Sequence, residues 1–209
     1  MKKFYQLLVT IALLSNTLFA QNDPNAKKVL DAMSNKIKAA KGITVIFSLK
    51  SITSKGKPNG VKSGNLSLRG SKYYLKQGKN EITCDGSKVY NFDGNKTITV
   101  SSVEEGDQAL SPQKLLSGSY GKDFTYKLIS SAGKQYQIEL TPTNNRKNFQ
   151  KVILFIDKTQ NFITKANIID KSNNTTEASF SNIKTNAVLA DKLFMFDKSK
   201  YPTDVDILD

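Results

Sequence analysis

Apolar and polar residues alternate with a period of two along most of the chain, a pattern typical of half-buried β-strands. In residues 43–52, for example, Val45, Phe47 and Leu49 fall on one side. Turn residues recur about every 8–12 positions, which predicts a sandwich or barrel of about eleven strands. The predicted strands are residues 43–52, 64–68, 72–76, 81–84, 88–92, 98–100, 124–129, 135–141, 152–157, 163–170, 175–183 and 193–196.

Short turn sequences join these strands into antiparallel hairpins. Asp85 and Asp93 are each followed by Gly, and this dipeptide favours a two-residue hairpin turn. The sequence has no internal repeat and no Pro/Gly/Ser-rich linker. We therefore expect residues 21–209 to form a single domain.

Helical spacing replaces the alternation at two places. In residues 25–41 the apolar residues recur on one face, Asn22 or Asp23 can cap the N-terminus, and Gly42 can end the helix. A shorter helix is predicted to begin at Ser111. Each helix has an apolar stripe that must lie against another element.

The size of the predicted sheet bears on function. A barrel of about eight strands is just filled by its own side chains, and larger ones leave space. Two amphipathic helices over the inner side of a strongly curved sheet would enclose an apolar cavity suited to a lipid or acyl chain. The alternative is an ordinary core that the helices complete without a cavity, and the pattern alone leaves both open.

The first twenty residues have the parts of a secretory signal peptide. Lys2 and Lys3 provide the positive charge, and residues 7–14 form the apolar centre. A membrane anchor is the alternative, but the apolar stretch is short for a spanning helix, which needs about 20 residues. We expect residues 1–20 to be removed on export and the mature chain to begin near Gln21.

Composition excludes most familiar enzyme chemistry. The 209 residues contain no His and one Cys, so there is no Ser-His or Cys-His relay, no His-ligated metal and no internal disulfide. Cys84 falls at an inward strand position and is expected to be a small buried hydrophobic residue. The acidic cluster of Glu104, Glu105 and Asp107 is expected to be a solvated turn. We expect no cofactor, no metal and no enzymatic activity.

Positive charge is concentrated in one region. The chain has a formal net charge of +13, and residues 32–80 contain eleven Lys/Arg but no Asp or Glu. Arg69 and Arg146 are the only arginines, and base readout favours Arg, so an anionic membrane or partner is a better fit than nucleic acid. The alternative is a solvated Lys-rich surface without a partner.

Several characteristic segments occur in order along the chain. They are the helix at 25–41 followed by ITVIFSL, GNLSLRGSKYYL at 64–75, EITCDGSKVYNFD at 81–93, SPQKLL at 111–116, FQKVILFID at 149–157 and LFMFD at 193–197. In this order they resemble the periplasmic outer-membrane lipoprotein carrier family, LolA. The resemblance covers essentially the whole mature chain, and the segment at 81–93 is its most specific part.

The resemblance implies a fold and a set of partners. The fold would be mainly β, an unclosed, strongly curved antiparallel barrel of about eleven strands with a helical lid. Its hydrophobic cavity would bind the acyl chains of lipoproteins, received from an ATP-driven inner-membrane transporter, with an outer-membrane acceptor as a further candidate partner. We expect a monomer without nucleic-acid binding.

Together with the alternation, the resemblance implies wall and lid residues for this cavity. The lipid-binding wall would consist of Val45, Phe47, Leu49, Leu66, Leu68, Tyr73, Tyr90, Phe92, Ile98, Phe124, Leu154 and Phe180. The lid would carry Val29, Leu30, Met33, Leu115 and Leu116.

Two departures from the family pattern affect these expectations. In family members an Arg after the Gly-x-Leu strand helps to hold the lid closed, whereas Gly70 stands here and Arg69, one residue earlier, would face the other way. Family members also line the cavity with Trp, for which Tyr73, Tyr90 and Phe92 stand nearest, so we expect cargo preference to differ. A periplasmic lipid-sensing regulator of envelope stress and a lipid hydrolase of unfamiliar design remain alternatives.

Overall fold

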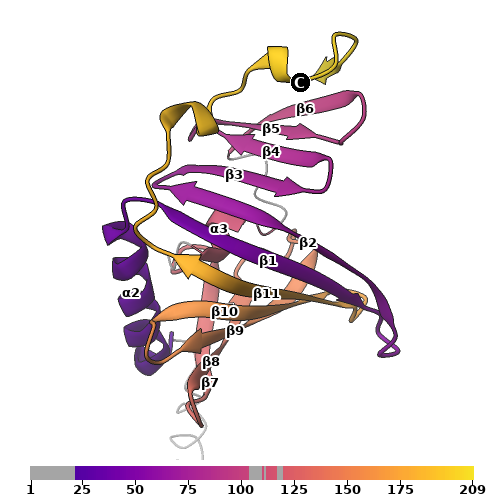
Figure 1. The fold of residues 1–209 in the computed structure, drawn as a ribbon. Helices are drawn as coiled ribbons and strands as arrows, with labels where there is room; N and C mark the ends of the chain where they lie inside the picture. The colour runs from indigo at the N-terminus through magenta and orange to yellow at the C-terminus, as the bar shows by residue number, and fades with distance from the viewer. Residues whose placement is uncertain (1–21, 104–109, 111, 117–119) are drawn as a thin grey trace, which may run out of the picture.

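The computed structural model describes residues 22–103, 110, 112–116 and 120–209, and these form one sheet of twelve strands with the order β12-β6-β5-β4-β3-β2-β1-β11-β10-β9-β8-β7 (Figure 1). The elements in chain order are α2 (Pro24–Ala39), β1 (Ile43–Ile52), β2 (Pro58–Arg69), β3 (Lys72–Gln77), β4 (Asn80–Cys84), β5 (Lys88–Phe92), β6 (Thr97–Ser102), α3 (Pro112–Leu116), β7 (Phe124–Ser130), β8 (Gln135–Pro142), β9 (Phe149–Asp157), β10 (Phe162–Asp170), β11 (Thr175–Lys184), the 3-10 helices η2 (Asp191–Phe194) and η3 (Lys198–Lys200), and β12 (Asp206–Leu208).

The sheet is curved and does not close into a barrel, because β7 and β12 remain its two edges. Neighbouring strands are antiparallel except for β12, which pairs in parallel with β6. In the middle of the sheet β1 pairs with β11, and Phe47 lies opposite Phe180, so early and late parts of the chain meet there. The predicted class, mainly β with an unclosed curved barrel and a helical cover, is confirmed.

Aspartate side chains build the hairpin turns. The Oδ1 atom of Asp85 accepts hydrogen bonds from the backbone N–H groups of Ser87 and Lys88, both at 2.8 Å. Asp93 has the same role in the next turn, and the Gly after each Asp has a positive φ, 101° and 82°. A short side-chain acceptor satisfies donors that the tight turn leaves unpaired. Both predicted Asp-Gly turns are therefore confirmed.

The N-terminus of α2 is fastened to the edge of the sheet. Asp23 caps the helix by accepting from the N–H of Asn25 at 2.8 Å, as expected for this residue type. Its other oxygen accepts from the N–H of Leu128 at 2.9 Å, and Asn22 accepts from the N–H of Tyr126 at 3.0 Å. Asn22 and Asp23 thereby accept hydrogen bonds from backbone N–H groups of the edge strand β7 that would otherwise be unpaired.

The C-terminal region differs from the sequence-based prediction. A strand was expected at residues 193–196, but η2 ends at Phe194, whose side chain is fully buried against the sheet. The free edge of β6 is taken instead by β12, a strand that the sequence pattern did not reveal. The prediction was wrong because the apolar run packs on a face of the sheet and does not add to its edge.

Two sequence-based expectations concern residues beyond the described part. The proposed signal peptide, residues 1–20, and the acidic cluster at 104, 105 and 107 both lie outside the described residues. Within the part of the chain that is described, no helix has the length and apolar character needed to cross a bilayer.

Candidate functional site

Cross-strand pairing gathers apolar side chains from many strands onto one face of the sheet. Val45 lies opposite Leu66, Leu66 opposite Leu75, and Leu75 opposite Ile82. Directly opposed residues point to the same side. We call the side that carries this row the inner face and the opposite side the outer face.

Nine of the twelve predicted wall residues lie on the inner face and pack in or against the main core. They are Val45, Phe47, Leu49, Leu66, Leu68, Tyr73, Phe124, Leu154 and Phe180.

The five predicted lid residues belong to the same apolar cluster. Val29, Leu30 and Met33 are buried on α2, which packs against β7 and β10, and Leu115 and Leu116 are buried on α3. Figure 1 shows α2 at one end of the strands β9 and β10. In this conformation the two helices therefore pack directly against the apolar side chains of the inner face.

A glycine makes room for the ring of Phe47 in the centre of the inner face. Gly64 on β2 lies opposite Phe47, and a Cβ atom at this position would come within 2.6 Å of the Phe47 ring and 2.2 Å of the carbonyl oxygen of Lys76. Real Cβ atoms do not approach so closely, so only Gly allows the ring to lie over β2.

Three predicted wall residues face the other way. Tyr90 lies opposite Thr83 and stacks on Phe196 with ring centroids 4.3 Å apart, Phe92 contacts Tyr201, and Ile98 lies opposite Phe92. All three are on the outer face, so placing them on the inner wall was wrong. The reason is that the C-terminal segment covers the outer face of β3–β6 and gives these strands a second apolar side.

Arg69 faces outward, as the period-two argument predicted. Its Nη1 donates to the carbonyl oxygen of Leu189 at 2.9 Å, its Nη2 forms an ion pair with Asp191, and its guanidinium lies 5.0 Å from the ring centroid of Phe194. Gly70 lies in the β2–β3 turn with φ of 59°. Arg69 thus holds the C-terminal segment on the outer face, the side opposite the one on which α2 and α3 pack.

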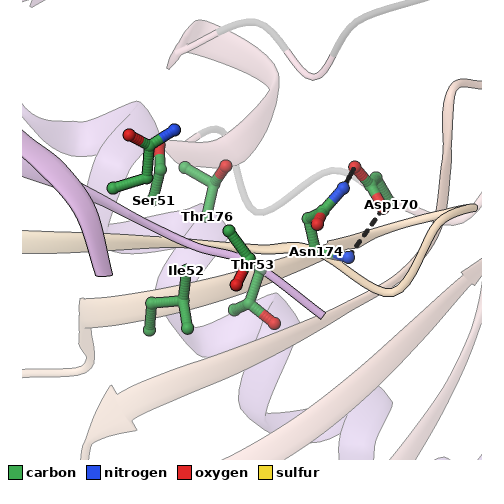
Figure 2. A pocket seen from close by; sticks show the side chains of 8 residues that line it. Ser51, Ile52, Thr53, Asp170, Asn174 and Thr176 are labelled. Carbon is green, nitrogen blue, oxygen red and sulfur yellow. Dashed lines mark hydrogen bonds between the residues drawn. The ribbon is translucent and has the colours of Figure 1, made fainter. Parts of the chain in front are cut away.

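The inner face ends in polar pockets at the hairpin ends of the strands. A pocket of about 300 Å³ is lined mainly by hydroxyl and amide residues, among them Ser51, Thr53, Asp170, Asn174 and Thr176 (Figure 2). In Figure 2 the Asp170 carboxylate is joined to Asn174, whose Nδ2 and backbone N each donate to it at 2.8 Å. A second pocket, of about 500 Å³, lies beside the β3–β4 and β5–β6 turns. Neither pocket is lined by the predicted wall residues.

Two titratable groups on the inner face, Tyr73 and Cys84, are held in their neutral forms. Burial raises the pKa of Tyr73 to about 12, and burial likewise raises the pKa of the Cys84 thiol, which lies opposite Tyr73. An apolar environment disfavours the charged form of both groups. Among the described residues there is no group of three His, Cys, Asp or Glu side chains that could hold a metal ion.

Several inner-face residues were not among the predicted site residues. Leu75 and Ile82 are paired on this face, and the alternation of their strands could have identified them. Tyr120 is also buried in the core and donates a hydrogen bond from its hydroxyl to the carbonyl oxygen of Leu115. Tyr120 lies outside the helices and strands, after the five-residue helix α3, so neither helical nor strand periodicity could have identified it.

Comparison with protein families agrees with this architecture. The sequence model of a family described as outer membrane lipoprotein carrier protein LolA matches residues 38–197. This chain belongs to the LolA family. The match begins in the last turn of α2 and ends just after η2, so β12 and η3 of this LolA protein lie beyond it.

Solved structures are similar to this LolA protein at low sequence identity. An uncharacterized conserved protein from Thermus thermophilus has a TM-score of 0.56 and 10% identity, with 88% of this chain and 98% of that chain covered. A LolA superfamily protein from Nitrosomonas europaea has a TM-score of 0.48 and 13% identity, covering 82% and 97%. The lipoprotein LppX from Mycobacterium tuberculosis has a TM-score of 0.47 and 12% identity, covering 80% and 99%. No curated protein sequence matches this chain significantly.

Proposed function

We propose that this LolA protein is a periplasmic carrier that binds the acyl chains of lipoproteins on its inner face and moves them from the inner to the outer membrane. The observation that carries the proposal is the single apolar cluster formed by wall and lid, in which Met33 and Leu116 join Val45 and Leu154. If α2 and α3 move aside, acyl chains can replace their side chains against the wall.

The energetics suit a carrier that must also release its cargo. Each buried methylene contributes about 0.8 kcal/mol, so two or three acyl chains can bind very tightly. Opening the lid first separates its side chains from the wall, and this cost lowers the net affinity. Polar contacts hold α2 at both ends, from Asp23 to β7 and from the Lys36 ammonium to the carbonyl oxygen of Gln160. Such contacts can reform when the cargo leaves.

The partners in this proposal follow from charge and from the expected signal peptide. The Lys-rich region, residues 32–80, would dock to the ATP-driven transporter of the inner membrane or to an anionic membrane surface. An outer-membrane acceptor would receive the cargo. Export by residues 1–20 would place the carrier in the periplasm.

Binding of a synthetic triacylated lipopeptide, measured by native mass spectrometry and titration, tests the proposal. We expect one-to-one binding by the unaltered protein. Leu49→Gln, on the inner face, should weaken it about tenfold, because a polar amide then faces the chains. The matched control is Ile46→Gln on the same strand, since Ile46 is 40% exposed on the outer face.

The outcomes of this experiment separate the candidate functions. Equal binding by both variants, or none by the unaltered protein, would contradict acyl-chain binding on the inner face. A periplasmic protein that co-purifies with the chain in place of lipid would favour the regulatory alternative.

A further inference from the structure

The pocket of about 500 Å³ lies where the inner face meets the hairpin turns. Its lining includes Lys62 on β2, Gln77 and Lys79 at the β3–β4 turn, and Asp93 and Gly94 at the β5–β6 turn. Three separate hairpins therefore contribute to one hollow.

Two close contacts between neighbouring turns build this pocket. The Nδ2 atom of Asn80 donates to the backbone carbonyl oxygen of Asp93 at 3.0 Å. Gly94 has φ of 82°, and a Cβ atom there would come within 2.8 Å of the Cβ of Lys79. The two turns are thus packed against each other, and together they form one side of the pocket.

The charges in the pocket favour an anion. Lys62 and Lys79 are exposed, and neither forms an ion pair with any described residue. The carboxylate of Asp93 points into its own turn, where Oδ1 accepts from the N–H groups of Asn95 at 2.8 Å and Lys96 at 3.0 Å. The lining of the pocket therefore has a net positive charge, because it contains two unpaired ammonium groups and one carboxylate, and the carboxylate is already hydrogen-bonded within its turn.

The pocket directly adjoins the apolar wall. Gln77 follows Leu75 by two residues on β3, and Asn80 precedes Ile82 by two residues on β4. Residues two apart share a face of a strand and lie about 7 Å from each other. On β2, Lys62 lies opposite the wall residue Leu49. The apolar surface and the basic pocket are therefore direct neighbours, as the Leu49–Lys62 pair shows. This arrangement fits an amphiphile with an anionic head group.

We propose that this pocket binds the phosphate group of a phospholipid whose acyl chains occupy the inner face. The inference rests on the proposed function, because it places the chains on the same wall. It adds a second class of cargo, in which Lys62 and Lys79 act as point charges for the phosphate and the Asn80 and Gln77 amides as neutral donors. The volume is ample for a glycerophosphate head.

Two lipids with the same acyl chains test the proposal: phosphatidylglycerol and the uncharged diacylglycerol. We expect the unaltered protein to bind phosphatidylglycerol at least tenfold more tightly. The double variant Lys62→Gln/Lys79→Gln should lose this preference and keep its affinity for diacylglycerol. Lys134→Gln/Lys184→Gln is the matched control, because both lysines are exposed and lie outside the pocket.

Soluble glycerol phosphate distinguishes a lipid head from a free phosphate compound. Competition by it at the concentration at which phosphatidylglycerol binds would overturn the lipid assignment. Equal affinity for the two lipids, or an equal loss in both double variants, would overturn the pocket's role while leaving acyl-chain binding intact. Failure to bind diacylglycerol and the triacylated lipopeptide alike would contradict the proposed function itself, and this inference with it.

Discussion

At the scale of single residues, the inner face depends on side chains that are small or absent as much as on large apolar ones. Phe47 can lie across β2 because Gly64 has no Cβ atom. Ala166 on β10 and Ala178 on β11 lie opposite each other and are likewise small residues at buried positions of the same cluster. Cores are packed so closely that one added methyl group is felt.

Gly64→Ala should therefore destabilise the protein by about 1–3 kcal/mol, because the new methyl group overlaps the Phe47 ring and the Lys76 carbonyl. Urea unfolding followed by circular dichroism measures the change. Gly121→Ala is the control, since its Cβ would meet nothing within 4 Å. Equal midpoints for the two variants would show that Phe47 is free to move away.

The lowered pKa of the Asp23 carboxyl makes the stability of the fold depend on pH. The N–H groups of Leu128 and Asn25 hold the pKa of its carboxyl below the ordinary value of 3.8, so the folded protein favours the charged form. Its stabilising contribution is complete above pH of about 3.8 and is lost as the pH falls through the lower folded pKa.

Asp23→Ala should consequently lower the urea midpoint at pH 6, and the difference from the unaltered protein should narrow toward pH 3. Asp31→Ala, which removes an exposed carboxylate paired with Lys27 on the same helix, is the control. A difference that stays constant over this pH range would contradict a role for the charged carboxylate.

At the scale of elements, the C-terminal segment, residues 189–209, creates a second apolar layer on the outer face. Phe194 and Val205 are buried there, and Phe196 stacks between Tyr90 and Tyr201, with centroids 4.3 and 5.7 Å away. The segment ends in β12, which covers the edge of β6. An otherwise exposed sheet edge is a template for association, and this short strand limits it.

Arg69→Ala should loosen this segment without unfolding the sheet. The lost hydrogen bond to Leu189 and the lost contact with Phe194 together amount to about 1.5 kcal/mol, or roughly tenfold in local opening. Limited proteolysis followed by mass spectrometry should show cleavage within residues 189–209 that is about tenfold faster. Lys50→Ala on the outer face of β1 is the control, and equal cleavage rates would contradict the role of Arg69.

At the scale of the whole molecule, the Lys-rich region includes the hairpin that joins β1 and β2. The β1–β2 hairpin carries Lys55 and Lys57 at its exposed tip, and Figure 1 shows this tip extending past the other strands. Each Lys near an anionic surface contributes about 1 kcal/mol at low salt, and the contribution is screened as salt rises.

Lys55→Glu/Lys57→Glu should weaken binding to vesicles that contain phosphatidylglycerol by more than tenfold at low salt. Vesicle sedimentation at low and high salt measures this, and the difference between variant and unaltered protein should shrink at high salt. Lys134→Glu/Lys184→Glu changes the net charge equally at other exposed positions. If both double variants bind the vesicles equally weakly, the loss of binding is caused by the change in net charge and not by the position of the two lysines in the hairpin.

Local sequence patterns were enough to predict which residues share a side of each strand and where the chain turns. Alternation groups Val45 with Phe47 and separates Arg69 from Gly70, and Asp23, Asp85 and Asp93 mark a helix start and two hairpins. These are local properties: side-chain direction and turn geometry depend on residues a few positions apart. They were sufficient to predict a mainly β sandwich or barrel, whereas the unclosed curved barrel was implied by the family resemblance.

Local patterns could not predict which side of each strand becomes the inner face, because that depends on the segments packed against it. Tyr90, Phe92 and Ile98 alternate along their strands as the inner-face residues do, yet they lie on the outer face, where Phe196 and Tyr201 contact Tyr90 and Phe92. The basic pocket likewise joins Lys62 to turns that follow it by about 15 to 30 residues. Periodicity distinguishes two sides of a strand but cannot say what covers each, because the covering segment comes from elsewhere in the chain.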